Sequence, residues 1–446
     1  MRLFPWLRTH RTAPPHDNLG LMPARFVPLL YFALAHLSLA TAGAMLATDP
    51  VGLGASFYQP RMLAVVHLVT LGFLSAAILG SLYLVGPLAL RMRLPASPLD
   101  HAGFWAFALG VSGLIGHFWL DAPRGMAWAA ALTILGMGQP VIRVLRELPA
   151  ARLPPEVKAP IAFALVNLLL AGLYGLLLGL NKLTPLLPGL HLRSVFAHAH
   201  LAAVGWGLMI VIGVGSRMIP MVLPAAMPRG RVVWAASLLT ELGVLSLVVA
   251  IPLGGTVAGV AALLVAAGIL AFLSRLIFML RHRRPAPREL RQPDLGVLHA
   301  LQAVVYLVLT ASLGVWLAWA APSGVSGRRF LVYGVFGLLG FLCQMVVGVA
   351  SRLLPLAFWL WGFADRDFKM TMPPLHRAPS YALQVTVFAL WSGGVPGLAA
   401  GLGLGLPWLT RLGAIGLTLA TVANALSIAV MLARLWKRPA RSADVA

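Results

Sequence analysis

Long apolar runs, separated by short connectors rich in charged residues, proline and glycine, make up most of the chain. A helix needs about 20 apolar residues to cross a bilayer, and twelve runs reach roughly that length. They are residues 26–47, 62–88, 101–120, 125–145, 158–181, 195–223, 231–251, 255–280, 295–320, 328–358, 380–403 and 408–436. The pattern therefore predicts an all-α integral membrane protein of twelve transmembrane helices, with residues 1–446 forming one transmembrane domain.

A 21-residue pattern recurs three times within these runs. The copies are His67–Pro87 (HLVTLGFLSAAILGSLYLVGP), His200–Pro220 (HLAAVGWGLMIVIGVGSRMIP) and Val335–Pro355 (VFGLLGFLCQMVVGVASRLLP). In register they share a glycine, an aromatic residue, a second glycine and the closing proline: Gly72, Gly205 and Gly340; Phe73, Trp206 and Phe341; Gly80, Gly213 and Gly348; Pro87, Pro220 and Pro355. Two copies begin with histidine and the third begins with valine.

The spacing of the copies predicts three repeat units. The copies lie 133 and 135 residues apart, a distance that holds four predicted spans. We expect units at residues 26–145, 158–280 and 295–436, with the repeated pattern on the second span of each. Spans 2, 6 and 10 cross in the same direction, so the units would be parallel and related by a pseudo-threefold axis along the membrane normal.

The charged residues predict how the chain is oriented. The 446 residues are 60% hydrophobic and 10% charged, with 34 Lys and Arg against 12 Asp and Glu. With the N-terminus inside, only seven basic residues fall outside: Arg61, Arg124, Lys182, Arg193, Arg328, Arg329 and Arg411. Cytoplasmic connectors carry the excess of Lys and Arg, so we expect both termini in the cytoplasm of a bacterial inner membrane. The basic residues then contact membrane lipids rather than nucleic acid. No apolar core precedes the first span, so no cleaved signal peptide is expected.

Histidines within the spans are the main candidates for chemistry. The single cysteine, Cys343, excludes an intrachain disulfide and an iron–sulfur cluster held by this chain. A histidine in a bilayer core is costly unless it is paired or coordinated. The candidates are His36, His67, His117, His198, His200 and His299. Four of them, His67, His117, His198 and His200, lie near the predicted outer ends of their spans, where histidines at similar depth suit a cofactor.

One pair of histidines stands at the same position of the repeat. His67 and His200 have the same expected depth on helices around a shared axis, which suits a bis-histidine haem b. His198 lies two residues before His200 and about 200° away on a helix, so the two point apart and either could ligate. The repeat glycines would let a bulky ring approach the backbone. Alternatively, these histidines hydrogen-bond backbone or water, and the glycines serve close helix packing.

Glu241 is the only carboxylate well inside a predicted span. A lone buried glutamate is largely protonated unless it is paired. Its candidate roles are a proton relay, a metal ligand or a simple hydrogen-bonding group. With His198 and His200 it forms a candidate set of ligands for copper or non-haem iron.

These features together resemble subunit I of the haem-copper oxidases. The resemblance rests on twelve spans in three parallel groups of four, on histidines in spans 2 and 6, and on the H-x-H of span 6. The local sequences around His67 and His200 look like the cbb3-type and nitric-oxide-reductase branch and the related NnrS-type membrane haem proteins. The resemblance implies that His67 ligates a haem b, and that His198 or His200 ligates copper or non-haem iron.

The chain also departs from that family. The family has an H-x-H on span 10, where this chain has Val335 in the repeat position, and an adjacent His-His on span 7, where it has only Glu241. Standard oxygen reduction is therefore not expected. We expect a membrane protein with one or two b-type haems, held by spans 2 and 6 through His67 with His200 or His198, and with His36 and His117 as further candidate ligands. Such a protein would carry electrons from a cytochrome c or quinol, or bind a small gas such as nitric oxide.

Two other functions remain open. A cofactor-free transporter would have a central cavity lined by His36, Glu241, Gln302 and Gln344. A copper-binding or assembly factor would use His198 and His200 together with the methionines Met209 and Met218. The oligomeric state is not predicted.

Overall fold

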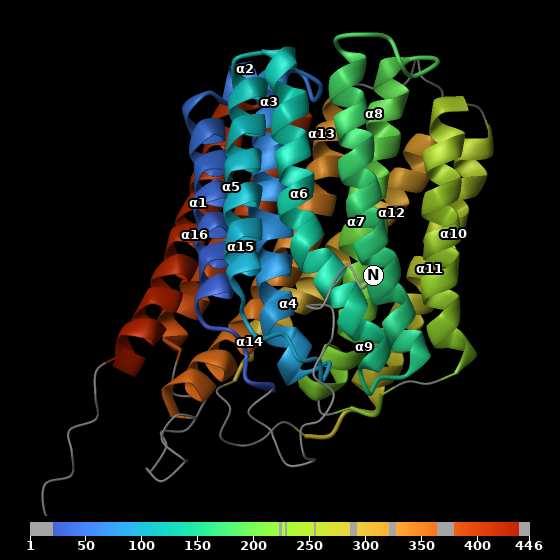
Figure 1. Cartoon of the computed structure of the whole chain (residues 1–446). Helices are drawn as coiled ribbons and strands as arrows, with labels where there is room; N and C mark the ends of the chain where they lie inside the picture. The colour runs from blue at the N-terminus through green and yellow to red at the C-terminus, as the bar shows by residue number, and fades with distance from the viewer. Residues whose placement is uncertain are drawn as a thin grey trace, which may run out of the picture.

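Twelve helices are long and apolar enough to cross a membrane, as the hydrophobic pattern predicts (Figure 1). The computed structural model describes residues 21–222, 225–227, 230–253, 256–285, 292–320, 327–363 and 379–436. These residues form helices joined by short connectors, with no strand among them. Both chain ends, which were expected in the cytoplasm, lie outside the described residues.

The spans keep the predicted order along the chain. Nine of them are formed by α1 (Phe26–Thr48), α5 (Pro98–Trp119), α6 (Pro123–Glu147), α7 (Pro155–Asn181), α10 (Arg231–Leu253), α11 (Thr256–Arg281), α12 (Leu295–Trp319), α15 (Tyr381–Leu404) and α16 (Pro407–Trp436). Spans 2, 6 and 10 are composite: α3 (Pro60–His67), η3 (Leu68–Ser75) and α4 (Ala76–Leu88); α8 (His191–His200), η5 (Leu201–Leu208) and α9 (Met209–Val222); α13 (Gly327–Gly334), η7 (Val335–Cys343) and α14 (Gln344–Phe363). Two short helices, α2 (Pro50–Gly54) and η4 (Leu148–Ala150), lie between spans.

Each of the three composite spans contains a π-helical stretch that begins at the first or second residue of the 21-residue pattern. The stretch begins directly after His67 in span 2 and after His200 in span 6, and it begins at Val335 in span 10. The hydrophobic pattern did not predict these stretches, because a π-turn changes the backbone hydrogen bonding without requiring a different composition. π-Helical turns are rare and occur frequently at functional sites.

The composite spans run in the same direction through the bundle (Figure 1). Their first segments, α3, α8 and α13, lie toward one end, and α4, α9 and α14 lie toward the other. In the middle, η7 contacts both η3 and η5, and the indole N–H of Trp206 donates to Ser75 Oγ at 3.3 Å. The three repeated segments therefore meet inside the bundle, while other spans such as α1 and α16 pack side by side around them.

The first shared glycine of each copy allows close packing on the preceding span. A Cβ at Gly72 would lie 2.5 Å from Ser38 Cβ, and one at Gly340 would lie 2.5 Å from Tyr306 Cγ. In span 6, a Cβ at Gly205 would lie 3.1 Å from Asn167. These glycines therefore face neighbouring helices, which agrees with the packing alternative and not with a role in admitting a bulky ring.

Helix ends differ from the predicted boundaries by a few residues where polar side chains cap them. Span 3 was expected to begin at residue 101, but α5 begins at Pro98 because Ser97 and Asp100 form a reciprocal capping box. The polar start of this helix is hidden from a hydropathy pattern, yet it contributes an important carboxylate to the interior.

Candidate functional site

His67 is the last residue of α3, the first segment of span 2. One of its ring nitrogens is held by a hydrogen bond, and the other has none in the part of the chain that the structure describes. Its Nδ1 lies 2.7 Å from the carbonyl oxygen of Leu63, so this nitrogen carries the proton and donates it. The face of the imidazole stacks on Phe118, with ring centroids 4.6 Å apart. Stacking covers the face and not the edge of the ring, so the Nε2 lone pair stays available for a ligand. Within the described residues, Nε2 has no hydrogen bond.

His198, on α8, has the reverse arrangement, because its Nδ1 and not its Nε2 is the free nitrogen. Its ring lies in hydrogen-bonding range of the Ala171 carbonyl on α7, while its Nδ1 is buried without a partner. The ring lies edge-on to Tyr174, with centroids 6.2 Å apart, and a Cβ at Gly175 would lie 3.0 Å from His198 Cε1. With the proton on Nε2, the buried Nδ1 holds a free lone pair in an interior where unsatisfied polar atoms are costly.

His67 and His198 lie close enough to interact electrostatically. Each therefore offers one unprotonated nitrogen while a backbone carbonyl fixes the other, which is the usual arrangement of a metal-ligating histidine. A positive group lies beside them, because the ammonium of Lys182 sits 5.7 Å from the Phe118 ring centroid and interacts with His67. The structure thus brings together one of the two pairings that the sequence left open.

His200 contacts span 10. Its Nδ1 lies 2.8 Å from the carbonyl oxygen of Phe196, and its Nε2 accepts from the Tyr333 hydroxyl at 3.2 Å. The two rings also stack, with centroids 5.9 Å apart. Both nitrogens of His200 are therefore occupied by the interface between spans 6 and 10. His198 and His200 face different helices, as their spacing predicted.

The two histidine contacts are equivalent in the repeat. Tyr333 stands two residues before Val335, where His198 stands two residues before His200. The first residue of one copy thus approaches the residue two before the next copy, as His67 with His198 and as His200 with Tyr333. This signal is present in the sequence, because Tyr333 and His198 hold the same position relative to their copies. A comparison of histidines alone does not reveal it.

His117 lies near the first pair but is not joined to it by a hydrogen bond. Its buried Nδ1 has no partner, and its ring rests directly on the backbone of α6, where a Cβ at Gly125 would overlap it. It belongs to the same outer end of α5 as Phe118, the residue that stacks on His67. It remains a candidate ligand or second-sphere group.

His36 and the polar residues of spans 9 to 12 form a separate region. His36 Nδ1 contacts the Phe32 carbonyl at 2.7 Å, and its Nε2 accepts from Asn424 at 3.0 Å. It lines a mostly apolar groove of about 550 Å³ between α1 and α16. Gln302 accepts from Gln344 and from Ser392, both at 2.8 Å. With both nitrogens bonded, His36 is not prepared to ligate a metal.

Glu241 hydrogen-bonds to Asn167, and not to any of the histidines. The Asn167 amide donates to Glu241 Oε2 at 2.9 Å and to the Gly205 carbonyl at 3.1 Å. Among the described residues, no group of three or more His, Cys, Asp or Glu side chains is arranged to hold a metal. The set of His198, His200 and Glu241 is therefore not brought together, and the transporter set of His36, Glu241 and the two glutamines is divided between separate regions.

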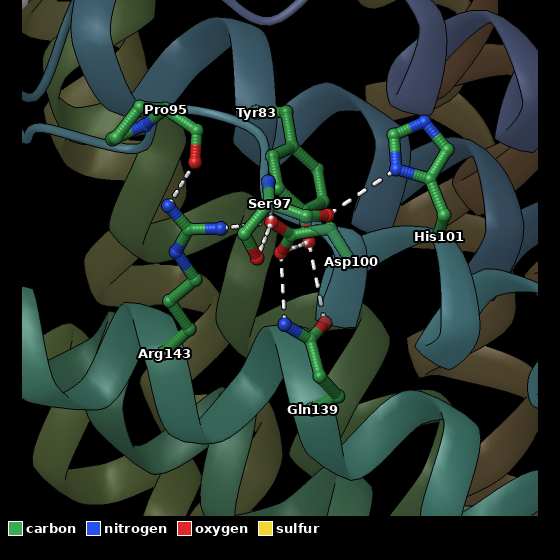
Figure 2. A network of polar contacts seen from close by, with 7 residues as sticks. All are labelled: Tyr83, Pro95, Ser97, Asp100, His101, Gln139 and Arg143. Atoms are coloured by element: carbon green, nitrogen blue, oxygen red, sulfur yellow. Dashed lines mark hydrogen bonds and ion pairs between the residues drawn. The ribbon is translucent and has the colours of Figure 1, made fainter. Parts of the chain in front are cut away.

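A polar network that the sequence did not predict lies at the other end of unit one (Figure 2). Asp100 is fully buried and pairs with Arg143. Its carboxylate also accepts from the Tyr83 hydroxyl at 2.7 Å and from the Gln139 amide at 2.8 Å. The Ser97 hydroxyl and backbone N–H each donate at 2.6 Å. Because every oxygen has partners, this network ties spans 2, 3 and 4 together and is structural.

Comparison with known proteins does not place the chain in a family. No family model matches the sequence, and no curated protein matches it. The resemblance to the haem-copper oxidases therefore remains a hypothesis.

Proposed function

We propose that the chain is a membrane-embedded b-type haem protein with a haem-copper oxidase subunit I-like arrangement of three parallel units. In this proposal His67 and His198 hold the haem iron near the outer side of a bacterial inner membrane. The single observation that carries the proposal is that these two imidazoles lie near each other with one free lone pair each.

The residues present fit such a group. The carbonyls of Leu63 and Ala171 hold one N–H of each imidazole, which orients the rings and makes the free nitrogens better donors. Phe118 stacks on His67 and Tyr174 lies edge-on to His198, so each imidazole has an aromatic neighbour. Lys182 supplies a positive charge at the same end, where an acidic substituent of a cofactor would be stabilised.

A bound haem would supply one-electron chemistry or a site for a small gas such as nitric oxide. With His67 and His198 both holding the iron, the haem would be suited to electron transfer. A cytochrome c or a quinol is the expected electron donor. Val335 stands at the repeat position that holds histidine in the other two copies. This position therefore supplies no third histidine ligand, so we do not propose oxygen reduction.

The proposal is tested by haem content. Purified protein and the variants His67→Ala and His198→Ala are compared for bound haem per chain. We expect bound haem in the parent protein and at least about tenfold less in each variant, since loss of even a group that hydrogen-bonds to a ligand costs about 10- to 100-fold in affinity.

His200→Ala is the matched control. It removes a neighbouring imidazole on the same helix whose nitrogens are both occupied, so we expect it to keep its haem. Equal loss in His200→Ala and His198→Ala would contradict the assignment of ligands. A colourless parent protein would favour the cofactor-free transporter, and copper without haem would favour a copper-binding protein.

A further inference from the structure

Arg275 is a buried cation without a bonded counterion. It lies on α11, and only 3% of it is exposed. Its Nη2 donates to Ser216 Oγ on α9 at 2.6 Å, but its Nε and Nη1 have no hydrogen-bond partner in the described part of the chain. Ser216 cannot neutralise the charge, because its hydroxyl is neutral and itself donates to the Ile212 carbonyl.

Arg143 in unit one has the carboxylate partner that Arg275 lacks among the described residues. Arg143, on span 4, pairs with the carboxylate of Asp100 and also bonds the Pro95 carbonyl. Arg275 occupies the corresponding span of unit two, span 8. By the offset of 133 residues, the position of Asp100 corresponds to Val233, a buried apolar residue. By the same offset Arg143 corresponds to Leu276, so Arg275 lies one residue before the equivalent position. Unit two therefore has a guanidinium on the same span and lacks the carboxylate.

Glu156 does not replace that carboxylate. Glu156, in the first turn of α7, interacts with Arg275 electrostatically but forms no hydrogen bond with it among the described residues. An unpaired buried charge is destabilising, and two buried N–H donors without partners add to this cost. An additional acceptor bound to the guanidinium would therefore stabilise the folded protein.

We propose that Arg275 and Ser216 form a binding site for a phosphate group, at the end of the bundle where spans 6 and 8 are predicted to reach the cytoplasm. Ser216 accepts one of the two N–H groups of Nη2, and the other lies beside a free donor, Nε–H or Nη1–H. The guanidinium therefore keeps one pair of neighbouring N–H groups for two oxygens of one phosphate. Arg275 lies six residues before Arg281, the last residue of α11, which is about 9 Å along a helix. This depth lets the long side chain reach toward the headgroup region.

The experiment compares melting temperatures of delipidated protein in a neutral detergent. A short-chain phosphatidylglycerol is added in one arm, and inorganic phosphate at the same concentration in the other. We expect a rise of at least about 2 °C with the lipid, because a ligand that binds only the folded state stabilises it. An equal rise with inorganic phosphate identifies a soluble phosphate as the occupant, and a rise with the lipid alone identifies a headgroup.

Three variants make the test specific. Arg275→Gln should lose the response, and Arg281→Gln, which removes an exposed arginine of the same helix, should keep it. Ser216→Asp places a carboxylate beside the guanidinium, so it should be stable without phosphate and should not respond. If Arg275→Gln does not fold, the response of the Ser216→Asp melting temperature to added lipid or phosphate tests the proposal. An undiminished response in Ser216→Asp, or no response in the parent protein, would overturn the proposal.

Discussion

At the scale of single residues, the second ring nitrogen distinguishes the histidines. His67, His198 and His200 look alike in sequence, since all are intramembrane histidines near the repeated pattern. In the structure His67 and His198 each keep a free lone pair, whereas His200 uses both nitrogens in hydrogen bonds. Spacing alone could not decide this, because it fixes the direction of a side chain and not the identity of its partner.

Tyr333→Phe tests the role assigned to His200. The change removes only the hydroxyl that donates to His200 Nε2. We expect the free energy of unfolding to fall by about 0.5–1.5 kcal/mol, the usual contribution of one hydrogen bond, with no change in haem content. Denaturation in mixed micelles and the haem to protein ratio measure the two effects. Loss of haem in this variant would show that the His200 interface belongs to the cofactor site.

Asp100→Asn tests the network at the opposite end. The variant leaves Arg143 beside a neutral amide and weakens several charge-assisted hydrogen bonds (Figure 2). We expect a loss of about 2–3 kcal/mol in stability, measured by the same denaturation. His101→Ala is the control, since His101 contacts only the Ser97 carbonyl nearby. A loss in Asp100→Asn no larger than in His101→Ala would contradict a structural role for the carboxylate.

At the scale of elements, the repeated pattern describes how the second span of each unit packs. The shared glycines face the preceding span, and each copy contains a π-helical stretch that begins at its first or second residue. The number and order of the spans followed from the hydrophobic pattern. A run of about 20 apolar residues is long enough to cross a bilayer as a helix, and a helix satisfies its own backbone hydrogen bonds there. The π-stretches and the partner of each buried polar group did not follow from the pattern, because they depend on contacts between residues far apart in sequence.

Gly340→Ala and Gly334→Ala form a matched pair on span 10. A Cβ at Gly340 would lie 2.5 Å from the Tyr306 ring, whereas one at Gly334 meets nothing within 4 Å. We expect Gly340→Ala to lower stability by about 1–3 kcal/mol through overpacking, and Gly334→Ala to be neutral or stabilising by up to about 1 kcal/mol. The melting temperatures of the two variants test this difference. Equal melting temperatures would contradict the close packing of spans 9 and 10.

At the scale of the whole molecule, twelve apolar helices place the chain in a membrane, and the basic residues predict which side is inside. The only cysteine, Cys343, is buried, so a Cys343→Ser background permits labelling at chosen sites. Thr184 and Ala96 are exposed residues of connectors at opposite ends of the bundle.

We expect a membrane-impermeant maleimide to label Thr184→Cys in intact spheroplasts and to label Ala96→Cys only after the membrane is opened. This result follows from the excess of basic residues in cytoplasmic connectors. The reverse pattern of labelling would show that the predicted orientation is inverted.

The absorption spectrum of the purified protein tests the central claim most directly. It is recorded in the oxidised state and after reduction with dithionite, each with and without nitric oxide, for the parent protein and for His67→Ala and His198→Ala. We predict a Soret band that shifts on reduction in the parent protein and is lost in both variants. A change with nitric oxide would identify a gas-binding site, and no change would identify an electron carrier with both axial positions filled. A parent protein without a Soret band, or variants with the parent spectrum, would contradict the proposal that His67 and His198 hold a haem.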